Sequence, residues 1–295
     1  MPFDDWLSRG EVRLCCKSRG LGDTLFVTTV ARELKKRRDA LRVTVERHWP
    51  QLFYNNKDIA ATFPIGNEPS PDAIHVDYHD RWPPPEDKHV LTTLCERFGI
   101  EDPELRTYYY PTPEERAKAR LIRPPSTRPL LVVHPFSGFF AARSKQWDFR
   151  QWKRCLEAIP PEIETLRFSD VEDPATPTDR PNHREIVGMD LRLIAAILQS
   201  ADAFTGQESG LAHVATALGI PSVVLFTGFV PPAVFGYEQN INLVPDLPYS
   251  PCWNKDGCPP CKAEICTRAI QSETVCEKSL EVLERSLSRS RNRLW

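Results

Sequence analysis

The sequence predicts two α/β domains, each built on a parallel sheet. The chain has 295 residues, which is more than one ordinary domain and suits two domains of roughly 100–150 residues each. Short apolar segments alternate with segments of helical periodicity, and this alternation is typical of βαβ units and therefore of parallel sheets. A proline-rich segment at residues 123–129 separates the two sets of elements and indicates a linker.

The first domain opens with a complete βαβ unit. Its two strands are predicted at residues 11–17 and 41–45. Between them, apolar residues from Val27 to Leu34 recur at helical spacing, and the basic run at residues 35–38 suits a helix C-terminus. The remaining elements before the linker are a strand at residues 73–76 and helices at residues 88–98 and 113–121.

The second domain alternates strands with helices. The predicted strands are residues 130–134, 164–168, 203–205 and 221–226, and the predicted helices are residues 147–158, 190–199 and 209–218. Two Rossmann-like domains that face a central cleft are the most economical architecture for these elements. We expect residues 1–125 to form the N-terminal domain and residues 126–295 the C-terminal domain, which ends in a helix.

Composition and charge exclude several classes of protein. Hydrophobic residues make up 41% of the chain and charged residues 26%, so the chain is able to bury a core and is not disordered by composition. The net charge of −2 does not indicate the basic surface that nucleic-acid binding requires. No apolar run approaches the roughly 20 residues that span a bilayer, and the acidic start lacks the apolar core of a secretory signal. We therefore expect a cytoplasmic protein.

The C-terminal end carries a basic cluster. Arg285, Arg289, Arg291 and Arg293 precede Trp295. One interpretation is a frayed and solvated end. The other is contact with anionic lipid headgroups, which places the protein at the inner face of the membrane.

A glycine-rich turn, Arg19-Gly20-Leu21-Gly22-Asp23, follows the first predicted strand. Glycine lets the backbone come close to a ligand, and a helix N-terminus favours an anion. Asp23 then either lies at the mouth of the cleft as a functional carboxylate or only caps the helix. The spacing leaves both interpretations open.

A second loop, residues 134–138 (HPFSG), follows the first strand of the second domain and precedes Lys145. Such a loop offers backbone N–H groups and a lysine to phosphate oxygens. The alternative is an ordinary βα loop with an exposed lysine.

The most informative segment is residues 206–221 (GQESGLAHVATALGIP). Ser209 and Gly210 open a helix directly after a strand, and the free N–H groups of that helix are suited to a diphosphate. Glu208 is placed to accept hydrogen bonds from sugar hydroxyls. The alternative is a capped surface helix with His213 packed on its inner side.

These three segments carry a resemblance to glycosyltransferase family 9, which is typified by the heptosyltransferases of lipopolysaccharide core assembly. GLGDTLFVTTVARELKKR resembles the N-terminal signature of that family, and HPFSGFFAARSKQWDFRQWKRCL is similar to its loop, basic residue, tryptophan and helix. ADAFTGQESGLAHVATALGIPSVVLFTGFVPP resembles its strongest signature, an Asp-Ser/Thr-Gly-x-x-His motif before an Ala-rich helix and a Pro-led strand. The segments occur in the family order.

The resemblance implies a GT-B fold, with an acceptor-side N-terminal domain and a nucleotide-sugar-binding C-terminal domain. It implies inverting transfer of a sugar, usually heptose from ADP-heptose, to a saccharide acceptor such as a lipopolysaccharide core or another surface glycan. No cofactor is required for catalysis in this scheme.

The same resemblance assigns roles to individual residues. Asp23 is the general base, Lys145 neutralises the departing diphosphate, and Glu208 replaces the usual Asp and binds the donor sugar or ribose. The other donor-binding residues that it implies are Gly22, Ser137, Ser209, Gly210, Leu211 and His213.

Three positions depart from the family pattern. Glu208 is one methylene longer than Asp, Phe136 stands where the family tends to have Gly, and residues 227–229 (TGF) replace the usual Gly-Pro-Thr. These departures leave open a different nucleotide sugar, a protein acceptor, or a catalytically silent homologue that only binds nucleotide sugars.

A cysteine cluster near the C-terminus has the spacing C-x5-C-x2-C-x4-C, formed by Cys252, Cys258, Cys261 and Cys266. The central C-x2-C pair is what two thiolates on one tetrahedral metal require. The four cysteines either bind a structural zinc or iron ion or remain as thiols and disulfides. Cys276 shares helical spacing with later leucines, so we expect it in the core.

Overall fold

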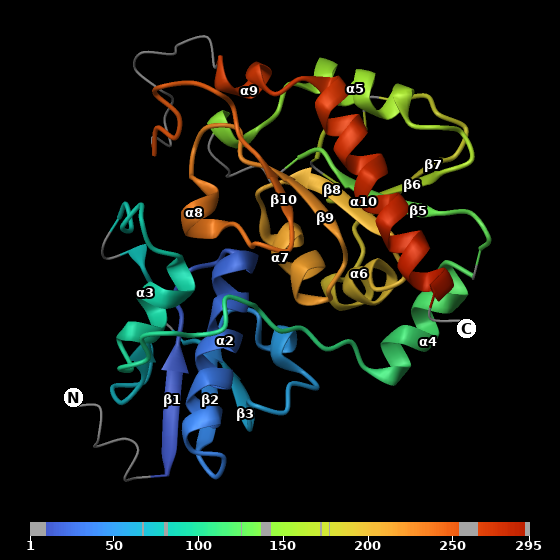
Figure 1. The fold of residues 1–295 in the computed structure, drawn as a ribbon. Helices are drawn as coiled ribbons and strands as arrows, with labels where there is room; N and C mark the ends of the chain where they lie inside the picture. Colours follow the sequence, from blue (N-terminus) through green and yellow to red (C-terminus); the bar gives the residue numbers. More distant parts are fainter. Residues whose placement is uncertain are drawn as a thin grey trace. The chain divides into compact units, whose positions relative to one another are not determined.

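The computed structural model describes residues 10–66, 68–79, 82–124, 126–136, 143–171, 173–176, 178–253 and 265–292. The chain divides into two compact units, Met1–Thr112 and Pro113–Trp295. Each unit has its own parallel sheet (Figure 1).

The first unit contains a four-stranded sheet in the order β3-β2-β1-β4, and every neighbouring pair is parallel. Its strands are β1 (Glu11–Cys15), β2 (Arg42–Arg47), β3 (Ala61–Pro64) and β4 (Ile74–His75). Its helices are α2 (Leu21–Arg37), the short 3-10 helix η1 (Pro50–Phe53) and α3 (Val90–Glu96). Because β1 pairs with both β2 and β4, the loops that leave the carboxyl ends of these three strands meet at one edge of the sheet.

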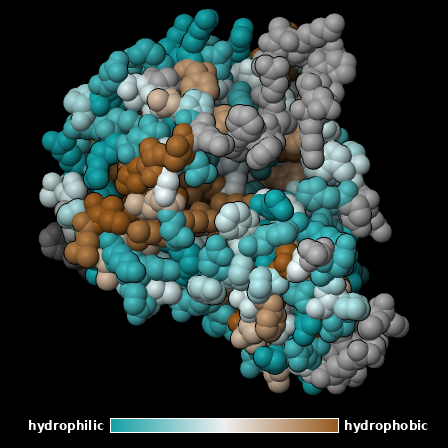
Figure 2. All heavy atoms as spheres, turned by 180° about the vertical axis from the view of Figure 1, so that it is seen from behind, coloured by the Kyte–Doolittle hydropathy of each residue, from teal (hydrophilic) through white to brown (hydrophobic). Residues whose placement is uncertain are grey.

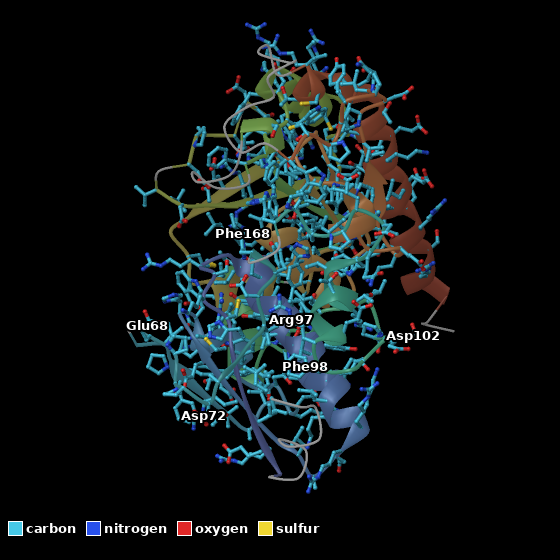
Figure 3. All side chains as sticks on the ribbon, turned by 90° about the vertical axis from the view of Figure 1, so that its left-hand side faces the viewer. Glu68, Asp72, Arg97, Phe98, Asp102 and Phe168 are labelled. Atoms are coloured by element: carbon cyan, nitrogen blue, oxygen red, sulfur yellow. The ribbon has the colours of Figure 1, made fainter. Side chains whose placement is uncertain are left out.

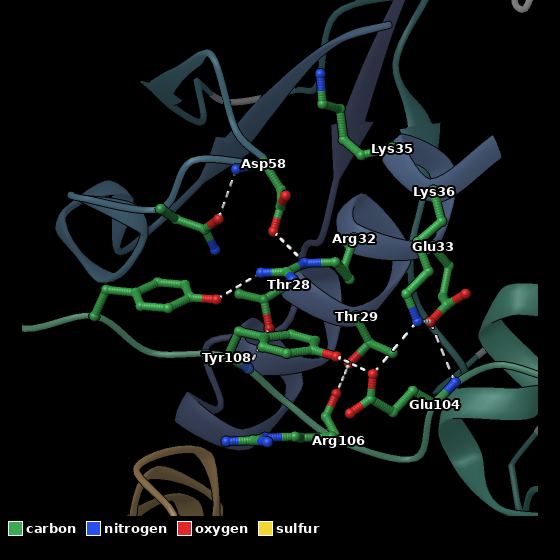
Figure 4. Close-up of polar contacts among 12 residues, drawn as sticks. Thr28, Thr29, Arg32, Glu33, Lys35, Lys36, Asp58, Glu104, Arg106 and Tyr108 are labelled. Carbon is green, nitrogen blue, oxygen red and sulfur yellow. Dashed lines mark hydrogen bonds and ion pairs between the residues drawn. The ribbon is translucent and has the colours of Figure 1, made fainter. Parts of the chain in front are cut away.

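Helix α2 is held in place by a polar network with other segments of the first unit (Figure 4). Thr29 Oγ1 donates a hydrogen bond to the carbonyl oxygen of Arg106 over 2.6 Å. Arg32 Nε donates to Asp58 Oδ2 over 2.5 Å. These contacts fix the helix whose first turn carries Asp23.

The second unit contains a six-stranded parallel sheet in the order β10-β9-β8-β5-β6-β7. Its strands are β5 (Leu130–His134), β6 (Glu164–Ser169), β7 (His183–Val187), β8 (Ala203–Gln207), β9 (Ser222–Leu225) and β10 (Ile241–Leu243). Its helices are α4 (Pro113–Ile122), η3 (Arg143–Lys145), α5 (Phe149–Ala158), α6 (Leu191–Leu198), α7 (Gly210–Ala217), α8 (Pro232–Phe235), α9 (Cys266–Ala269) and α10 (Ser272–Asn292).

The core of the second unit lies between its sheet and the neighbouring helices α5 and α10 (Figure 1). Trp147 and Trp152 are fully buried, with ring centroids 4.8 Å apart and ring planes at 80°. Thr205 of β8 and Ser279 of α10 share a hydrogen bond of 2.8 Å between their hydroxyl oxygens. Cys276 belongs to this core, as its helical spacing predicts.

The structure contains every strand and helix that the sequence predicts, with ends that differ by a few residues. Strands β3, β7 and β10 are additional, and all three lie at sheet edges. Their residues are largely half-exposed or exposed, so they lack the buried apolar run that marks β5.

Helix α4 groups with the second unit. Arg192 of α6 is 4% exposed and donates through Nη2 to Glu115 Oε2 of α4 over 2.7 Å, and its Nε donates to the other carboxylate oxygen. The boundary predicted from sequence falls after residue 125, beyond this helix. A paired arginine and carboxylate thus tie α4 to the unit that follows it in the chain.

The basic C-terminal segment is helical rather than frayed, because α10 continues through Asn292. Arg285 forms an ion pair with Glu281, one helical turn earlier. Arg293 and Trp295 lie outside the described residues.

The surface of the molecule is unevenly hydrophobic. Figure 2 shows hydrophobic residues gathered in a patch on part of one face. The most exposed large apolar side chains among the described residues are Val171 and Leu121, at 83% and 82%. In the described part of the chain, no helix is both long and apolar enough to cross a bilayer.

Candidate functional site

The loop between β1 and α2 is built around a buried arginine. Arg47, at the end of β2, is fully buried and donates to the carbonyl oxygens of Cys16 over 2.9 Å, Gly20 over 3.2 Å, and Ser18. Burial lowers the pKa of Arg47, although the Cys16 thiol and the Asp23 carboxylate oppose that shift. The guanidinium therefore fixes the path of the loop into the first turn of α2.

Asp23 accepts hydrogen bonds from two hydroxyl groups. Tyr78 donates to Oδ1 over 2.8 Å, and Ser18 donates to Oδ2. Gly20 is the N-cap of α2 and no side chain caps that position, so Asp23 is not the capping residue. Its side chain is 16% exposed. A carboxylate held by neutral donors and open to solvent on one side is suited to accept a proton.

Gly20 leaves the space that the Asp23 carboxylate fills. A Cβ atom on Gly20 would lie 2.6 Å from Asp23 Oδ2, which is closer than any contact a real Cβ makes. The backbone of Gly20 is extended, with φ of −66°, so the requirement for glycine is steric rather than conformational. Gly22 follows in the first turn of α2.

Three consecutive residues beside Asp23 were not predicted from the sequence: Asp77, Tyr78 and His79. They follow β4, which pairs with β1, so their loop lies next to the loop that carries Asp23. His79 Nδ1 is 2.6 Å from Asp77 Oδ1, and His79 Nε2 is 3.9 Å from Asp23 Oδ2. Polar residues directly after a parallel strand are a usable signal, because ligand sites gather at the carboxyl ends of strands.

In the second unit, the carboxylate of Glu208 directly follows β8 and is held by two basic side chains. Lys145 Nζ forms a close ion pair with Glu208 Oε2, and His213 Nε2 lies 3.5 Å from Oε1. The other ring nitrogen of His213 shares a hydrogen bond of 2.8 Å with the Tyr237 hydroxyl. Burial works to raise the pKa of Glu208, but Lys145 and His213 outweigh it and lower that pKa to about 2. Glu208 is therefore ionised at neutral pH.

Glu208 and His213 line a small cavity of about 10 Å³. Tyr237, Asn240 and Asn242 line it too, and both asparagines donate their amide N–H groups to other parts of the unit. Within the described residues, no donor reaches the buried Oδ1 atom of Asn240 or of Asn242. Two buried acceptors thus lie beside a carboxylate, in a cavity whose size suits a single water molecule.

The N-terminus of α7 adjoins this carboxylate. Ser209 is its N-cap, and no described residue hydrogen-bonds to the buried Ser209 hydroxyl. The N–H groups of Gly210 and Leu211 belong to the first helical turn, where no intrahelical acceptor exists. An anion is favoured at this end of the helix.

The sequence model of glycosyltransferase family 9, described as heptosyltransferase, matches residues 84–259 of the chain. The match covers more than half of the sequence and includes Lys145 and the helix that begins at Gly210. The chain belongs to glycosyltransferase family 9. No curated protein matches the sequence.

Solved structures of this family share the fold of the chain. A family 9 glycosyltransferase from Veillonella parvula DSM 2008 has a TM-score of 0.71 at 14% identity, over 93% of this chain and 97% of that one. The Escherichia coli ADP-heptose lipopolysaccharide heptosyltransferase II has a TM-score of 0.70 at 14% identity, over 93% and 99%. The dodecameric iron-containing heptosyltransferase TibC from enterotoxigenic E. coli, in complex with ADP-D-β-D-heptose, has a TM-score of 0.70 at 16% identity, over 94% and 76%. The predicted GT-B fold with Rossmann-like units is thus confirmed, and the chain is a glycosyltransferase.

The predicted donor residues of this family 9 enzyme are grouped around Glu208, while Asp23 and Gly22 begin α2 in the first unit. The predicted donor residues that lie together in the second unit are Lys145, Glu208, Ser209, Gly210, Leu211 and His213. Ser137 lies outside the described residues.

The segment that departs from the family pattern after β9 supports Lys145. The ring centroid of Phe229 lies 5.5 Å from Lys145 Nζ, a distance at which an aromatic face attracts a cation. Thr227 donates a hydrogen bond to the carbonyl oxygen of Ser144, the residue before Lys145. The substituted residues therefore contact the lysine side chain and the backbone of the residue before it.

Two of the four candidate metal ligands are described, and both pack against Gly228. The N–H group of Cys252 donates to the Gly228 carbonyl over 2.8 Å, and a Cβ atom on Gly228 would lie 2.6 Å from Cys266 Sγ. Cys258 and Cys261 lie outside the described residues. Among the residues that the structure does describe, no three potential metal ligands converge.

Proposed function

We propose that the enzyme transfers a heptose from ADP-heptose to a saccharide acceptor with inversion, and that Asp23 is the general base. The observation that carries this proposal is the setting of Asp23. Its carboxylate accepts hydrogen bonds from Ser18 and Tyr78 and lies in the first turn of a helix, and 16% of the side chain is exposed to solvent. Such a carboxylate is both held in position and accessible to a hydroxyl group.

The proposed reaction is a single displacement. Asp23 removes the proton from the acceptor hydroxyl as that oxygen forms a bond to the anomeric carbon of the donor. The bond from the anomeric carbon to the diphosphate breaks, and its electron pair leaves with ADP. Lys145 and the first-turn N–H groups of α7 compensate the charge on the diphosphate.

Glu208 supports donor binding in this proposal. Its pKa of about 2 keeps it ionised, so it accepts hydrogen bonds from sugar or ribose hydroxyls and does not exchange protons near neutral pH. Two relatives support heptose as the donor sugar. The E. coli protein is named an ADP-heptose heptosyltransferase, and the TibC structure holds ADP-D-β-D-heptose.

The proposed acceptor is a lipopolysaccharide core or another surface glycan that the enzyme meets at the inner face of the membrane. The name of the E. coli relative supports this acceptor class. The arginines of α10, among them Arg285 and Arg289, are the residues proposed to contact anionic headgroups. Loss of vesicle binding on deletion of residues 285–295 tests that contact.

The cysteine cluster is proposed to hold a structural zinc or iron ion through Cys252, Cys258, Cys261 and Cys266. Thiolates are the ligands that both ions accept, and four of them leave no open position for catalysis. The packing of Cys252 and Cys266 against Gly228, together with the iron reported for TibC, supports the proposal. Metal analysis that finds well under one equivalent of either ion in the purified protein contradicts it.

Calorimetry with a panel of nucleotide sugars tests the donor assignment. ADP-heptose, ADP-glucose, UDP-glucose and GDP-mannose are compared on the wild type, on Lys145→Ala and on Lys153→Ala. Lys153 is a control, because it pairs with Glu157 on the surface of α5. We expect selective binding of ADP-heptose, weakened about 10²-fold or more in Lys145→Ala alone.

The other outcomes of this panel are equally informative. Selective binding of a different nucleotide sugar removes heptose transfer from the proposal and keeps the reaction type. Binding without turnover on glycan or protein acceptors favours a silent homologue.

A further inference from the structure

The loop after β4 places a hydrogen-bonded pair, Asp77 and His79, beside Asp23. The Asp77 carboxylate receives two hydrogen bonds from His79, one from the backbone N–H over 2.9 Å and one from Nδ1 over 2.6 Å. Burial works to raise the pKa of Asp77, but these hydrogen bonds outweigh it and lower that pKa. Asp77 is therefore an ionised carboxylate whose oxygen only accepts hydrogen bonds.

This pairing fixes the tautomer of His79. Because Asp77 Oδ1 only accepts, the proton of the neutral imidazole resides on Nδ1 and the lone pair is on Nε2. Nε2 lies 3.9 Å from Asp23 Oδ2. The lone pair of a neutral imidazole thus faces the oxygen of the proposed base. In hydrolase triads, too, a carboxylate binds the Nδ1–H group of a histidine whose Nε2 accepts a proton.

Aromatic rings hold the imidazole in this orientation. The rings of His79 and Tyr78 are stacked with centroids 4.4 Å apart and planes at 20°. The Trp82 ring lies nearly parallel to the imidazole, at 15° and 6.3 Å. The faces of aromatic rings attract cations, so this setting also favours the imidazolium that forms on protonation.

We propose that His79 receives from Asp23 the proton that the acceptor hydroxyl has lost, and that Asp77 holds His79 in position for this transfer. The inference rests on the proposed role of Asp23 as general base. After glycosyl transfer, the O–H bond of protonated Asp23 breaks, its electron pair stays on the carboxylate, and the proton binds Nε2. The 3.9 Å between His79 Nε2 and Asp23 Oδ2 is about 1 Å longer than a hydrogen bond, so the proton passes through one bridging water molecule.

The exposure of the two side chains explains the need for a relay. The Asp23 side chain is 16% exposed, whereas the His79 side chain is 39% exposed. His79 therefore releases the proton to bulk water while the product still covers Asp23. This step speeds the return of Asp23 to the ionised form that the next turnover requires.

Among the described residues, the cysteines and arginines around the pair do not compete for this proton. Burial raises the pKa of the Cys15 thiol to about 11 and that of the Cys16 thiol to about 12, so both stay neutral. Arg47 faces the loop from β2, and Arg97, which follows α3 (Figure 3), lowers the pKa of Asp77. Both guanidinium groups remain cationic over the working range. Histidine is the side chain whose ordinary pKa lies between pH 5 and 8.

Turnover is measured as ADP release from ADP-heptose, with water in place of the acceptor hydroxyl. We expect His79→Ala to lower kcat about 10-fold or more with donor affinity unchanged. Wild-type kcat falls as acidification protonates His79, and this contribution to the acidic limb is lost in His79→Ala, whereas the contribution of Asp23 remains. Added neutral imidazole restores kcat in His79→Ala. The control is His75→Gln, a surface histidine of β4 whose side chain is not part of the site.

Two results for His79→Ala overturn the inference. The first is a kcat and an acidic limb that both equal those of the wild type. The second is a loss of kcat that added imidazole does not restore. Asp23→Asn separates this failure from that of the proposed function. An inactive Asp23→Asn beside a fully active His79→Ala removes only the relay, whereas an active Asp23→Asn removes the assigned base itself.

A second measurement does not depend on turnover. The NMR titration of His79, assigned by difference with His79→Gln, gives the pKa of the imidazole directly. We expect that pKa to fall in Asp77→Asn and also in Asp23→Asn, because each substitution removes a neighbouring negative charge. A His79 pKa that is the same in all three proteins contradicts the proposed coupling.

Discussion

Asp23 and Glu208 lie in similar backbone positions, but neutral groups surround the first carboxylate and basic groups surround the second. Asp23 and Glu208 each follow a buried parallel strand at the start of a helix. Asp23 is held by the hydroxyl groups of Ser18 and Tyr78, whereas Glu208 is held by Lys145 and His213. The strand–turn–helix motif thus places a carboxylate, and the neighbouring segments decide what that carboxylate does.

Electrostatics separates the two roles. The basic partners of Glu208 lower its pKa to about 2 despite burial, which makes it a permanent anion. In the described part of the chain, Asp23 has no lysine or arginine within ion-pair distance, and only His79 approaches it at 3.9 Å. A base must change its protonation state during turnover, and an anchor must not. The comparison supports the proposed roles, with Asp23 as the base and Glu208 as the anchor.

The largest effect is expected from Asp23→Asn. The amide retains the size of the side chain but does not accept the acceptor proton, so kcat should fall by about 10²–10⁴-fold while donor binding is preserved. Steady-state kinetics and calorimetry measure the two quantities. Asp39→Asn, at an exposed aspartate after α2, is the matched control. Near-normal turnover of Asp23→Asn would falsify the assignment of the base.

The next effect concerns stability and distinguishes the two carboxylates without substrate. The folded-state pKa of Glu208 lies below its ordinary value of 4.5, so its contribution to stability is complete above that value and is lost as the pH falls toward about 2. As the pH falls from 5 to 2, we expect the free energy of unfolding of the wild type to decrease by on the order of 3 kcal/mol more than that of Glu208→Gln.

Denaturant unfolding at several pH values measures this difference. Glu284→Gln, at an exposed glutamate of α10, should follow the wild type at every pH. A constant gap between wild type and Glu208→Gln over the whole range would mean that the ion pairs of Glu208 do not lower its pKa.

The smallest effect is expected from two glycine substitutions that act for different reasons. Gly20→Ala places a Cβ atom 2.6 Å from Asp23 Oδ2 and should lower kcat several-fold by displacing the carboxylate. Gly219→Ala meets no atom within 4 Å but adopts a φ of +75°, so it should cost about 1 kcal/mol of stability and leave kcat unchanged. Parallel kinetics and thermal unfolding check both. Equal effects on kcat would show that the space beside Asp23 is not required.

Local patterns explain the parts of the enzyme that the sequence predicts. A strand such as β5 is buried on both faces and is recognised by its apolar run, and a helix shows its period within a few turns. The same local reasoning places Asp23 and Glu208 at the carboxyl ends of strands. It fails for the edge strands β3, β7 and β10, because half-exposed residues carry no clear period.

The sequence by itself determined the α/β class, the order of its elements and the positions of the two carboxylates, because these depend on periodicity over a few neighbouring residues. Only the tertiary structure decided which partners those carboxylates have. The pairing of β4 with β1 brings His79 to Asp23, and the chain folds Lys145 and His213 onto Glu208. The approach of His79 to Asp23 and the ion pair of Lys145 with Glu208 join residues far apart in the chain, and pKa values depend on distance in space. The chemistry of each carboxylate was therefore set by folding.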